Sequence, residues 1–275
     1  MIMKQLKELR QHLKQVFKQN EIPLDEVDKI LCEVLKIDYS KLFLCEKIST
    51  LNTLKVNKIV KKRLSGKPLT KIFKQAYFYG LKFNVNKNVL SPRQETELLV
   101  TEALKVLNTD GKVLDVCTGS GAIAVAIKAN CACQVDALDI SKKALKTAKQ
   151  NAKLNNVNIN FFQSNMFEKI NDKYNVIVSN PPYIATKTVE QLPVEVKDYD
   201  PKLALDGGDD GLKFYKILAS ESPKFLENGG YLILEIGFDQ RESVECLLNS
   251  NNFDTICLKD YSQNDRVIIG KLKKV

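Results

Sequence analysis

The tetrapeptide Asn180-Pro181-Pro182-Tyr183 combines residue types that could hold a planar amino group during chemistry at its nitrogen. It follows the apolar run 174–179, which is typical of a strand that ends in a loop. Two consecutive prolines remove two backbone donors and fix two φ angles, so the segment is stiff and its carbonyls point outward. The Asn180 side chain and a neighbouring carbonyl can accept both hydrogens of an –NH2 group, and Tyr183 can lie against its flat face. An ordinary proline-rich turn is the alternative interpretation.

A second group of residues, from Asp115 to Gly121, lies where the first predicted strand of a sheet meets its first helix. Gly119 and Gly121 let the backbone turn tightly and approach a ligand closely. The first turn of the following helix offers free N–H groups to a polar or anionic group. The turn lacks the glycine and lysine spacing of a P-loop. The candidate ligand-binding residues of this turn are Asp115, Cys117, Thr118, Gly119, Ser120 and Gly121.

Asp139 ends the next predicted strand, about twenty residues after the turn, where an acidic side chain can accept both hydroxyls of a ribose. A dinucleotide site would have the pattern Gly-x-Gly-x-x-Gly, but Cys117 occupies the first glycine position and Ile123 or Ala124 lies near the third. The pattern therefore favours S-adenosylmethionine, which carries a ribose and an adenine but no phosphate. A helix cap is the alternative role of Asp139, although Ser141 is better suited to capping.

These candidate residues need a framework to position them, and the periodicity of the apolar residues predicts one after Glu95. Predicted helices cover 95–107, 121–129, 141–154, 211–221 and 239–249, and predicted strands cover 112–116, 134–139, 158–163, 174–179, 230–236, 253–258 and 265–272. This alternation indicates an α/β fold with a doubly wound, mostly parallel sheet. The last two strands leave no room for a helix between them, so we expect an antiparallel hairpin at the sheet edge. Ligands bind at the carboxyl ends of the parallel strands in this architecture, which is where both candidate clusters fall.

The first part of the chain has a different pattern, typical of a small helical bundle. Apolar residues recur at steps of three and four over 6–16 and 27–35, and again over 56–64 before Gly66. The period then changes toward two, which suggests a hairpin. Nothing in the bundle suggests chemistry, and His12 is expected on its surface. We therefore predict a helical bundle at 1–66, a hairpin linker at 67–90 and the α/β domain at 91–275.

Composition excludes several classes of protein. The 275 residues and 44% hydrophobic content suffice for one large or two modest domains with hydrophobic cores. No apolar run approaches the roughly 20 residues that cross a bilayer, and the N-terminus lacks the apolar centre of a signal peptide. We therefore expect a cytoplasmic protein with no membrane partner.

The chain has seven cysteines and one histidine, and its only close cysteine pair, Cys131 and Cys133, has the wrong spacing for a zinc knuckle. We therefore expect no metal site and reduced, mostly buried thiols. The formal net charge of +9 is carried overwhelmingly by lysines, which are spread along the chain without one dense block. Charge thus supports a nucleic-acid partner only weakly.

Taken together, the chain resembles Rossmann-like methyltransferases that alkylate a planar amino group. More narrowly, it resembles the release-factor glutamine methyltransferases of the HemK type over essentially its full length. The stretches that carry the resemblance are 92–97, 115–122, 180–183, 201–208, 234–237 and 265–267. The resemblance implies S-adenosylmethionine as methyl donor, S-adenosylhomocysteine as product, and the glutamine amide in the Gly-Gly-Gln motif of class I peptide chain release factors as acceptor. It also implies that the N-terminal bundle helps to dock the release factor, and we expect a monomer.

The chain departs from the family's usual pattern at several positions. The family usually has Pro and Asp where this chain has Gln94 and Glu95, and a common Gly where it has Cys117. Asn165 stands where an Asp often lies near the adenine, and its carbonyl oxygen can still accept a hydrogen bond from the adenine amine. Met166 would then pack against the adenine ring, or else serve as a core residue.

The mechanism that we predict is direct displacement at the sulfonium methyl group. Asn180 Oδ1 and the Pro181 carbonyl would accept the two N–H bonds of the amide, stabilise developing positive charge and hold the nitrogen in line. Pro182 and Tyr183 would complete the substrate site, and Asp115 would orient the methionine end of the donor. Neither Glu235 nor Arg266 receives a role.

Three alternatives remain open on the sequence. A nucleic-acid methyltransferase that acts on an exocyclic base amine would use the same tetrapeptide, with base flipping for a duplex substrate. A non-catalytic adaptor would use the fold only to sense the cofactor. A dehydrogenase is disfavoured by the glycine spacing and has no use for Asn180.

Overall fold

The chain divides into two compact units, Met1–Phe73 and Lys74–Val275, in a computed structural model that describes residues 3–274. The division falls seven residues after the predicted end of the bundle. The predicted hairpin is present as β3 (Gln75–Phe78) and β4 (Leu81–Asn84), and it belongs to the second unit. The reason is packing, because Phe78 and Phe83 are buried in the same hydrophobic core as the first helix of the α/β unit.

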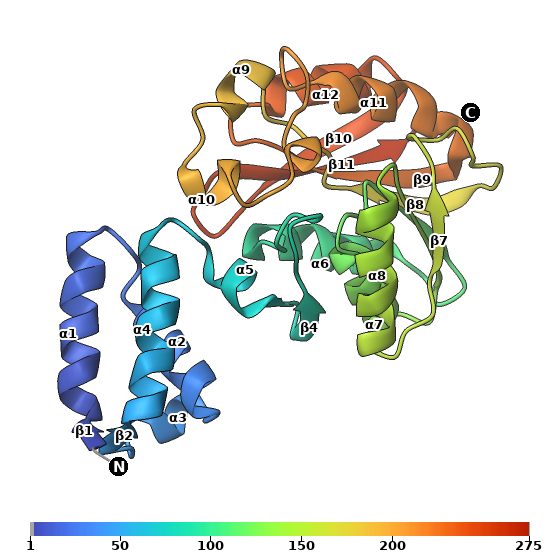
Figure 1. The fold of residues 1–275 in the computed structure, drawn as a ribbon. Coiled ribbons are helices and arrows are strands. Elements are labelled where there is room, and N and C mark those ends of the chain that lie inside the picture. Colours follow the sequence, from blue (N-terminus) through green and yellow to red (C-terminus); the bar gives the residue numbers. More distant parts are fainter. Residues whose placement is uncertain (1–2, 275) are drawn as a thin grey trace. The chain divides into compact units, whose positions relative to one another are not determined.

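The first unit is a helical bundle, as predicted, with a short strand pair that the apolar pattern did not reveal (Figure 1). Leu13 and Phe17 from the first helix pack with Ile30 and Leu31 from the second in one buried cluster. Ser49 begins α4 by accepting a hydrogen bond from the Asn52 backbone N–H at 3.2 Å. The elements are β1 (Met3–Gln5), α1 (Leu6–Gln19), α2 (Asp25–Leu35), α3 (Tyr39–Leu42), β2 (Lys47–Ser49), α4 (Thr50–Leu64) and α5 (Leu69–Phe73).

Positive charge is concentrated in this first unit, in contrast to the even spread that we expected. Residues 1–73 contain 16 Lys and Arg against 8 Asp and Glu, a net charge of +8 out of the chain's +9. Residues 47–94 contain 12 Lys and Arg and no acidic residue. On α4 the exposed side chains include four lysines for which no ion pair is found among the described residues: Lys55, Lys58, Lys61 and Lys62.

The second unit contains, within residues 74–274, a seven-stranded sheet in the order β10-β11-β9-β8-β5-β6-β7. Strands β5 to β9 pair in parallel, and β11 is antiparallel to both β9 and β10. The strands are β5 (Lys112–Val116), β6 (Gln134–Asp139), β7 (Asn160–Gln163), β8 (Tyr174–Ser179), β9 (Leu226–Glu235), β10 (Phe253–Lys259) and β11 (Asp265–Leu272). The predicted α/β class, the mostly parallel sheet and the terminal hairpin at its edge are confirmed.

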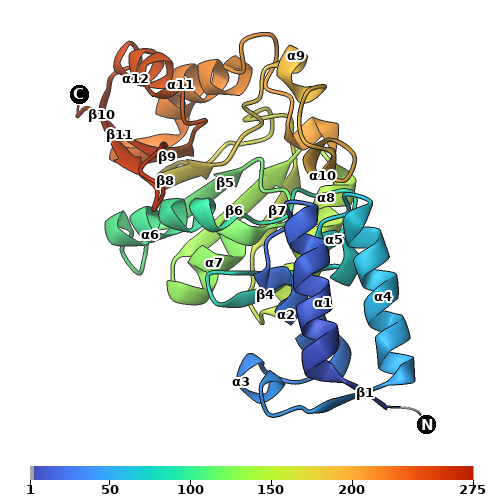
Figure 2. The same ribbon diagram turned by 90° about the vertical axis from the view of Figure 1, so that its left-hand side faces the viewer.

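Helices cover both faces of this sheet, which makes it doubly wound. Figure 2 shows α6 and α7 on one side and α11 and α12 on the other. Each face has its own buried cluster, one around Leu99 and Val125 and the other around Leu218 and Val244. The helices of this unit are α6 (Glu97–Val106), α7 (Ala122–Asn130), α8 (Lys142–Leu154), α9 (Thr186–Val189), α10 (Val194–Lys197), α11 (Lys213–Phe225) and α12 (Arg241–Asn249), with 3-10 turns η1 (Gln94–Thr96) and η2 (Lys202–Ala204).

Two further expectations differ from the structure. β9 begins at Leu226, earlier than predicted, and α11 extends to Phe225, because Pro223 is tolerated inside the helix near its end. Of the seven thiols only Cys133 is buried, and Cys246 is exposed, so the expectation of mostly buried thiols was wrong. Among the described residues there is no cluster of three or more metal-ligating side chains, and no helix there is long and apolar enough to span a membrane.

Candidate active site

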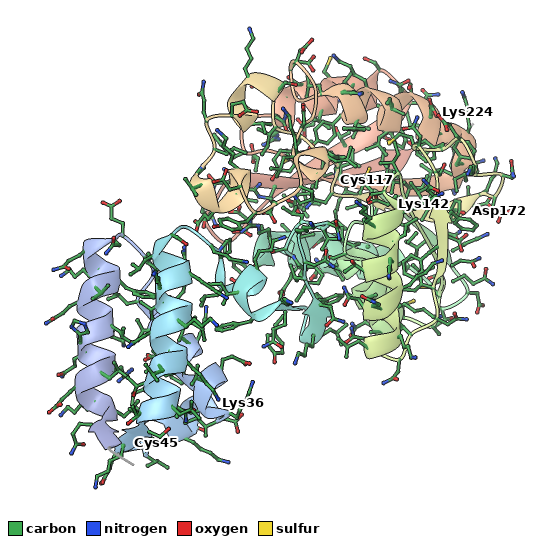
Figure 3. All side chains as sticks on the ribbon, viewed as in Figure 1. Lys36, Cys45, Cys117, Lys142, Asp172 and Lys224 are labelled. Carbon is green, nitrogen blue, oxygen red and sulfur yellow. The ribbon has the colours of Figure 1, made fainter. Side chains whose placement is uncertain are left out.

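The ends of three parallel strands bring the two candidate clusters together. Val116 is paired with Leu138 on one side and with Ser179 on the other, so the residues that follow β5, β6 and β8 emerge side by side. A cavity of about 420 Å³ lies at this end of the sheet. Figure 3 shows Cys117 near Lys142, the first residue of α8. Ser141, which directly precedes α8, also lines the cavity. The predicted residues that line the cavity are Cys117, Thr118, Gly119, Ser120, Asp139, Asn165, Met166, Asn180 and Pro182.

Asp115 is placed behind the glycine turn and outside the lining. Its Oδ2 accepts hydrogen bonds from Thr118 Oγ1 at 2.6 Å and from the Ala124 backbone N–H at 3.2 Å, which ties the turn to the first residues of α7. The side chain is fully buried, and its Oδ1 has no hydrogen-bond partner among the described residues. Burial raises the pKa of Asp115 to about 7. Asp115 thus organises the turn, and its predicted contact with the methionine end of a donor stays a prediction.

The backbone of the turn explains why glycine suits it. Cys117, Gly119 and Gly121 all have positive φ, at +62°, +55° and +80°. A Cβ on Gly121 would also lie 3.0 Å from the Ala148 Cβ of α8, so close helix packing requires glycine there. Cys117 adopts the left-handed conformation without that freedom, which costs on the order of 1 kcal/mol for a residue with a Cβ. Burial beside Asp139 raises the pKa of the Cys117 thiol well above its usual value, so the thiol stays protonated.

Asp139 connects the turn to the start of α8. Its Oδ2 accepts the Gly119 backbone N–H at 2.9 Å, and its Oδ1 accepts the Ser141 backbone N–H at 2.8 Å. Ser141, as predicted, is the N-cap of α8, since its Oγ accepts from the Ala144 backbone N–H at 3.2 Å. Burial raises the pKa of Asp139. Each carboxylate oxygen keeps a second lone pair, so both can still accept a hydroxyl hydrogen from a ligand in the cavity.

Asn165 and Met166 form the wall that follows β7. Asn165 donates its Nδ2 to Glu168 Oε1 at 2.7 Å, which leaves its Oδ1 as the acceptor that the predicted adenine contact needs. Met166 has a φ of +46° and is 6% exposed, and Ser164 holds its carbonyl through a hydrogen bond of 2.8 Å. Met166 both lines the cavity and packs in the core, so both predicted roles are compatible with its position.

The tetrapeptide lies partly in the lining and is braced from behind. Pro181 and Tyr183 are outside the lining, and Tyr183 packs against the core cluster of the α11 face. Burial, with a contribution from Glu235, raises the pKa of Tyr183 to about 12. A bridge joins Ile184 to Asp206, and a Cβ on Gly207 would lie 2.8 Å from the Pro182 carbonyl oxygen. The stretch 201–208, one of those that carry the family resemblance, therefore packs against the loop that carries Asn180.

Two polar residues beside Asn180 received no role in the sequence analysis. Asn180 Nδ2 donates to Thr96 Oγ1 at 3.3 Å, and Thr96 Oγ1 donates to Glu235 Oε2 at 2.5 Å. Glu235 is 3% exposed, and burial raises its pKa to about 7. The signal that could have identified Glu235 is its position, because an acidic residue ends the strand next to the one that precedes Asn180.

Arg93 and Asp200 are a further pair at the cavity. Arg93 lines the cavity and donates from Nη2 to Asp200 Oδ2 at 3.2 Å, which connects the segment before α6 to the segment after α10. Leu203 also lines the cavity and is 56% exposed. Arg93 and Leu203 belong to the stretches 92–97 and 201–208 that carry the family resemblance, and Asp200 directly precedes the second stretch; none of the three was predicted in the site.

Comparison with known proteins shows the family and the fold to which the chain is similar. A family model described as a methyltransferase small domain matches residues 83–195. The chain is 38% identical over 258 residues to the release factor glutamine methyltransferase of Thermodesulfovibrio yellowstonii, covering 90% of this chain and 92% of that protein. A relative of the same name from Francisella tularensis is 39% identical over 258 residues, covering 90% of each chain. A solved methyltransferase from Pyrococcus furiosus has a TM-score of 0.56 at 17% identity, covers 78% of this chain and 98% of that one, and shares the fold.

The similarity to the two relatives extends far beyond the region that the family model matches. An alignment that covers 90% of the chain is longer than the second unit, so it includes residues of both units. Identity near 40% over such a length, together with nearly complete coverage of the relatives, identifies the family. The chain belongs to the release factor glutamine methyltransferases.

Proposed function

We propose that the protein transfers a methyl group from S-adenosylmethionine to the side-chain amide nitrogen of the glutamine in the Gly-Gly-Gln motif of class I peptide chain release factors. The observation that carries the proposal is the shared cavity, which is lined both by the ribose-type acceptor Asp139 and by Asn180. Family membership supplies the class of acceptor. The protein would act in the cytoplasm, where translation factors are found.

The residues of the cavity fit S-adenosylmethionine. Asp139 offers two carboxylate oxygens for the ribose hydroxyls, and Asn165 Oδ1 offers an acceptor for the adenine amine. Met166 offers an apolar surface for the adenine ring, and the backbone of Cys117 to Gly119 forms the wall between β5 and α7. The cavity of about 420 Å³ lies within the usual range for small-molecule sites.

Asn180 and the Pro181 carbonyl would position the acceptor. An amide nitrogen is a poor nucleophile because its lone pair is delocalised into the carbonyl. Asn180 Oδ1 and the Pro181 carbonyl oxygen would accept its two hydrogens, which favours a pyramidal nitrogen and stabilises its developing positive charge. S-adenosylmethionine, when bound, supplies an electrophilic methyl group. The amide nitrogen would gain this methyl group as the bond from the methyl carbon to sulfur breaks, which leaves S-adenosylhomocysteine, and the nitrogen would release one proton to water.

The first unit would provide a docking surface for the release factor. Its α4 presents four exposed lysines for which no ion pair is found among the described residues, and such a surface attracts an acidic partner. The same charge is the observation that favours the second candidate, a nucleic-acid methyltransferase acting on an exocyclic base amine, because 12 basic residues without an acidic one also suit a phosphate backbone.

A substrate assay separates these two candidates. The protein is incubated with S-adenosylmethionine labelled in its methyl group and with either a purified class I release factor or ribosomal RNA. We expect label in the glutamine of the release factor and none in the RNA. Label in the RNA but not in the factor would overturn the proposed acceptor.

The substitution Asn180→Ala tests the amide clamp. It should reduce kcat by roughly 100-fold or more, because a group that stabilises transition-state charge is lost, while the Kd of S-adenosylmethionine changes little. Asn130→Ala is the matched control, since Asn130 is exposed at the end of α7 and outside the cavity lining. Full activity of Asn180→Ala would refute the clamp.

A further inference from the structure

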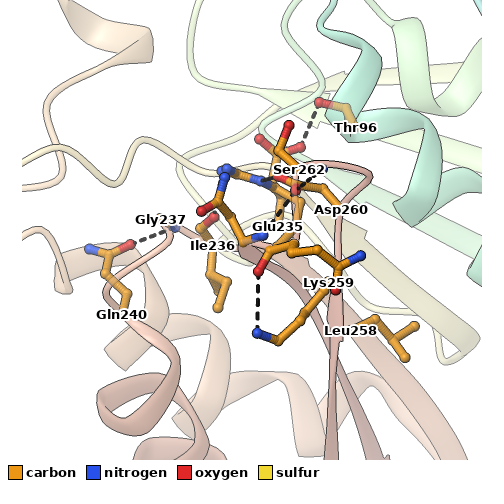
Figure 4. Close-up of polar contacts among 12 residues, drawn as sticks. Thr96, Glu235, Ile236, Gly237, Gln240, Leu258, Lys259, Asp260 and Ser262 are labelled. Atoms are coloured by element: carbon orange, nitrogen blue, oxygen red, sulfur yellow. Dashed lines mark hydrogen bonds and ion pairs between the residues drawn. The ribbon is translucent and has the colours of Figure 1, made fainter.

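Asn180, Thr96 and Glu235 come from three separate elements and meet at the wall of the cavity, which Asn180 and Thr96 line and Glu235 does not. Asn180 follows β8, Glu235 ends β9, and the two strands run in parallel with Ser179 opposite Leu234. Thr96 comes from η1 and reaches this point through its side chain, 5% exposed. Figure 4 shows the contact between Thr96 and Glu235. The three side chains thus form one connected group.

The chemistry of the three groups fixes the direction of these hydrogen bonds. An ionised carboxylate only accepts, so the single hydroxyl hydrogen of Thr96 must go to Glu235 Oε2, 2.5 Å away. Thr96 Oγ1 then accepts from Asn180 Nδ2 at 3.3 Å. The Asn180 side chain also faces Glu235 and lowers the pKa of that carboxyl, as a donor does. Both contacts engage the –NH2 end of the amide, so the oxygen Oδ1 is left for the cavity that Asn180 lines.

We propose that Glu235, acting directly and through Thr96, is a positioning residue that sets the orientation of the Asn180 amide so that Oδ1 accepts the substrate's N–H group. The inference rests on the proposed function and deepens it, because it assigns the group that keeps the clamp in its accepting orientation. Without such a partner, Asn180 could present –NH2 to the substrate amine. Two donors would then face each other, and the clamp would not hold.

Protonation of Glu235 would reverse this arrangement. A protonated carboxyl donates, so Thr96 can turn its own hydrogen toward Asn180, and the Asn180 oxygen is then drawn away from the cavity. The charged or titratable groups that face Glu235 are Glu95 from η1, Arg266 from β11, Tyr183 from the loop after β8 and Tyr215 from α11, whose hydroxyl donates to the Glu235 backbone carbonyl. Burial raises the pKa of Glu235 to about 7, with Glu95 adding to the rise, while the hydrogen bond from Thr96 and the charge of Arg266 oppose it.

The proposal gives three expected properties of variants at saturating S-adenosylmethionine. Glu235→Gln should lower kcat by about 10- to 100-fold, the range typical of groups that orient a binding residue, because a glutamine has one accepting oxygen and presents an –NH2 donor where the carboxylate has its second oxygen. Thr96→Val should lower kcat to a similar extent, and Thr96→Ser should retain most of it because the hydroxyl is kept. The Kd of S-adenosylmethionine should stay within about twofold in all three, measured by calorimetry.

The pH profile separates positioning from a purely structural role. The wild-type kcat should fall as pH decreases through about 7, and Glu235→Gln should lack this limb. Glu102→Gln is the matched control: Glu102 is 9% exposed, pairs with Lys105 on α6 and lies outside the cavity lining, so that variant should keep both kcat and the limb. A limb that persists unchanged in Glu235→Gln would overturn the proposal.

A readout without substrate completes the test. In the free protein, the side-chain ¹⁵NH2 resonance of Asn180 should shift with pH around 7 in the wild type and stay constant in Glu235→Gln. If the wild-type protein methylates no release factor, the proposed function is refuted. If the wild type is active and Glu235→Gln is equally active, only the positioning role is refuted. A Glu235→Gln protein that has lost kcat and unfolds at a much lower temperature would also count against positioning, since a structural role predicts that result.

Discussion

Asp115 and Glu235 are carboxyl groups buried at the carboxyl ends of β5 and β9, and neither takes part in an ion pair among the described residues. An unpaired carboxylate inside a protein is unfavourable because burial disfavours its charged form, and the pKa of both groups is raised for this reason. Asp115 accepts hydrogen bonds from Thr118 in the glycine turn and from Ala124 in α7, and Glu235 is connected to Asn180 through Thr96. Residues of the candidate site are thus connected to buried carboxyl groups that reduce stability near neutral pH.

This cost gives a prediction for the stability of the protein against pH. The pKa of Asp115 rises from 3.8 to about 7 on folding, so the folded state binds the proton more tightly and loses stability as pH rises from about 4 to 7. The variant Asp115→Asn has no ionisable group at this position, so its stability does not fall for this reason as pH rises. The free energy of unfolding of the wild type, relative to the variant, should therefore fall by roughly 4 kcal/mol between pH 4 and pH 8.

Denaturant titrations of both proteins at pH 4, 6 and 8 measure this difference. Glu235 titrates in the same range, but it is present in both proteins and its contribution cancels in the difference. A difference between wild type and variant that stays constant across this range would contradict the assigned burial of Asp115.

At the scale of elements, the turn between β5 and α7 depends on how closely α8 approaches it. Gly121 has a φ of +80°, and a Cβ there would lie 3.0 Å from the Ala148 Cβ, so α8 would have to give way by a few tenths of an ångström. Gly80, in the turn between β3 and β4, has a similar φ of +73°, but a Cβ there would meet nothing within 4 Å. The two glycines therefore share one requirement for backbone conformation and differ in packing.

The pair Gly121→Ala and Gly80→Ala separates the two effects. Gly80→Ala should cost about 1–2 kcal/mol of stability from its backbone conformation and leave the Kd of S-adenosylmethionine unchanged. Gly121→Ala should cost more, because α8 must move away, and it should weaken S-adenosylmethionine binding at least tenfold, since Asp139 and Ser141 move with that helix. Thermal unfolding and calorimetry give both quantities. Equal losses in the two variants would show that the close approach of α8 is unimportant.

At the scale of the whole molecule, the two units have different charge. Residues 1–73 carry a net charge of +8, whereas the chain as a whole carries +9, so the second unit is close to neutral. Within the first unit, Arg63 of α4 is buried and paired with Glu26 of α2, so it belongs to the bundle itself. The exposed lysines of the same helix are the ones that remain for a partner.

If α4 docks the release factor, replacing its exposed lysines should weaken binding of the release factor and leave binding of S-adenosylmethionine unchanged. The variant with Lys55, Lys58, Lys61 and Lys62 all changed to Gln should raise the KM for the release factor about tenfold at low salt and leave kcat and the Kd of S-adenosylmethionine unchanged. The matched control removes four exposed lysines of the second unit: Lys146, Lys149, Lys153 and Lys169. The difference should shrink in high salt. Equal effects of the two variants would mean that only overall charge matters.

Much of the framework could be predicted from local sequence. The bounds of β5, β6 and β8 coincide with the predicted strands, because a buried parallel strand is a continuous apolar run between loop residues. The glycine turn, Asp139 and the tetrapeptide could be identified as candidates because ligands in this architecture bind at the carboxyl ends of strands, where these residues lie. The short elements α9 and α10 were not predicted, since helices of one turn have too little periodicity to be read.

The tertiary structure decided which polar groups meet behind these motifs. Asn180 and Thr96 are 84 residues apart and Thr96 and Glu235 are 139 apart, so no spacing in the sequence could join them. Likewise, Asp115 lies behind the turn and outside the cavity lining, because its buried carboxyl accepts hydrogen bonds from Thr118 Oγ1 and the Ala124 backbone N–H. The sequence by itself determined the residues that surround the cavity, whose positions follow from local strand and turn geometry. Only the packing of distant segments determined what orients them, because hydrogen bonds between buried side chains depend on the folded sheet.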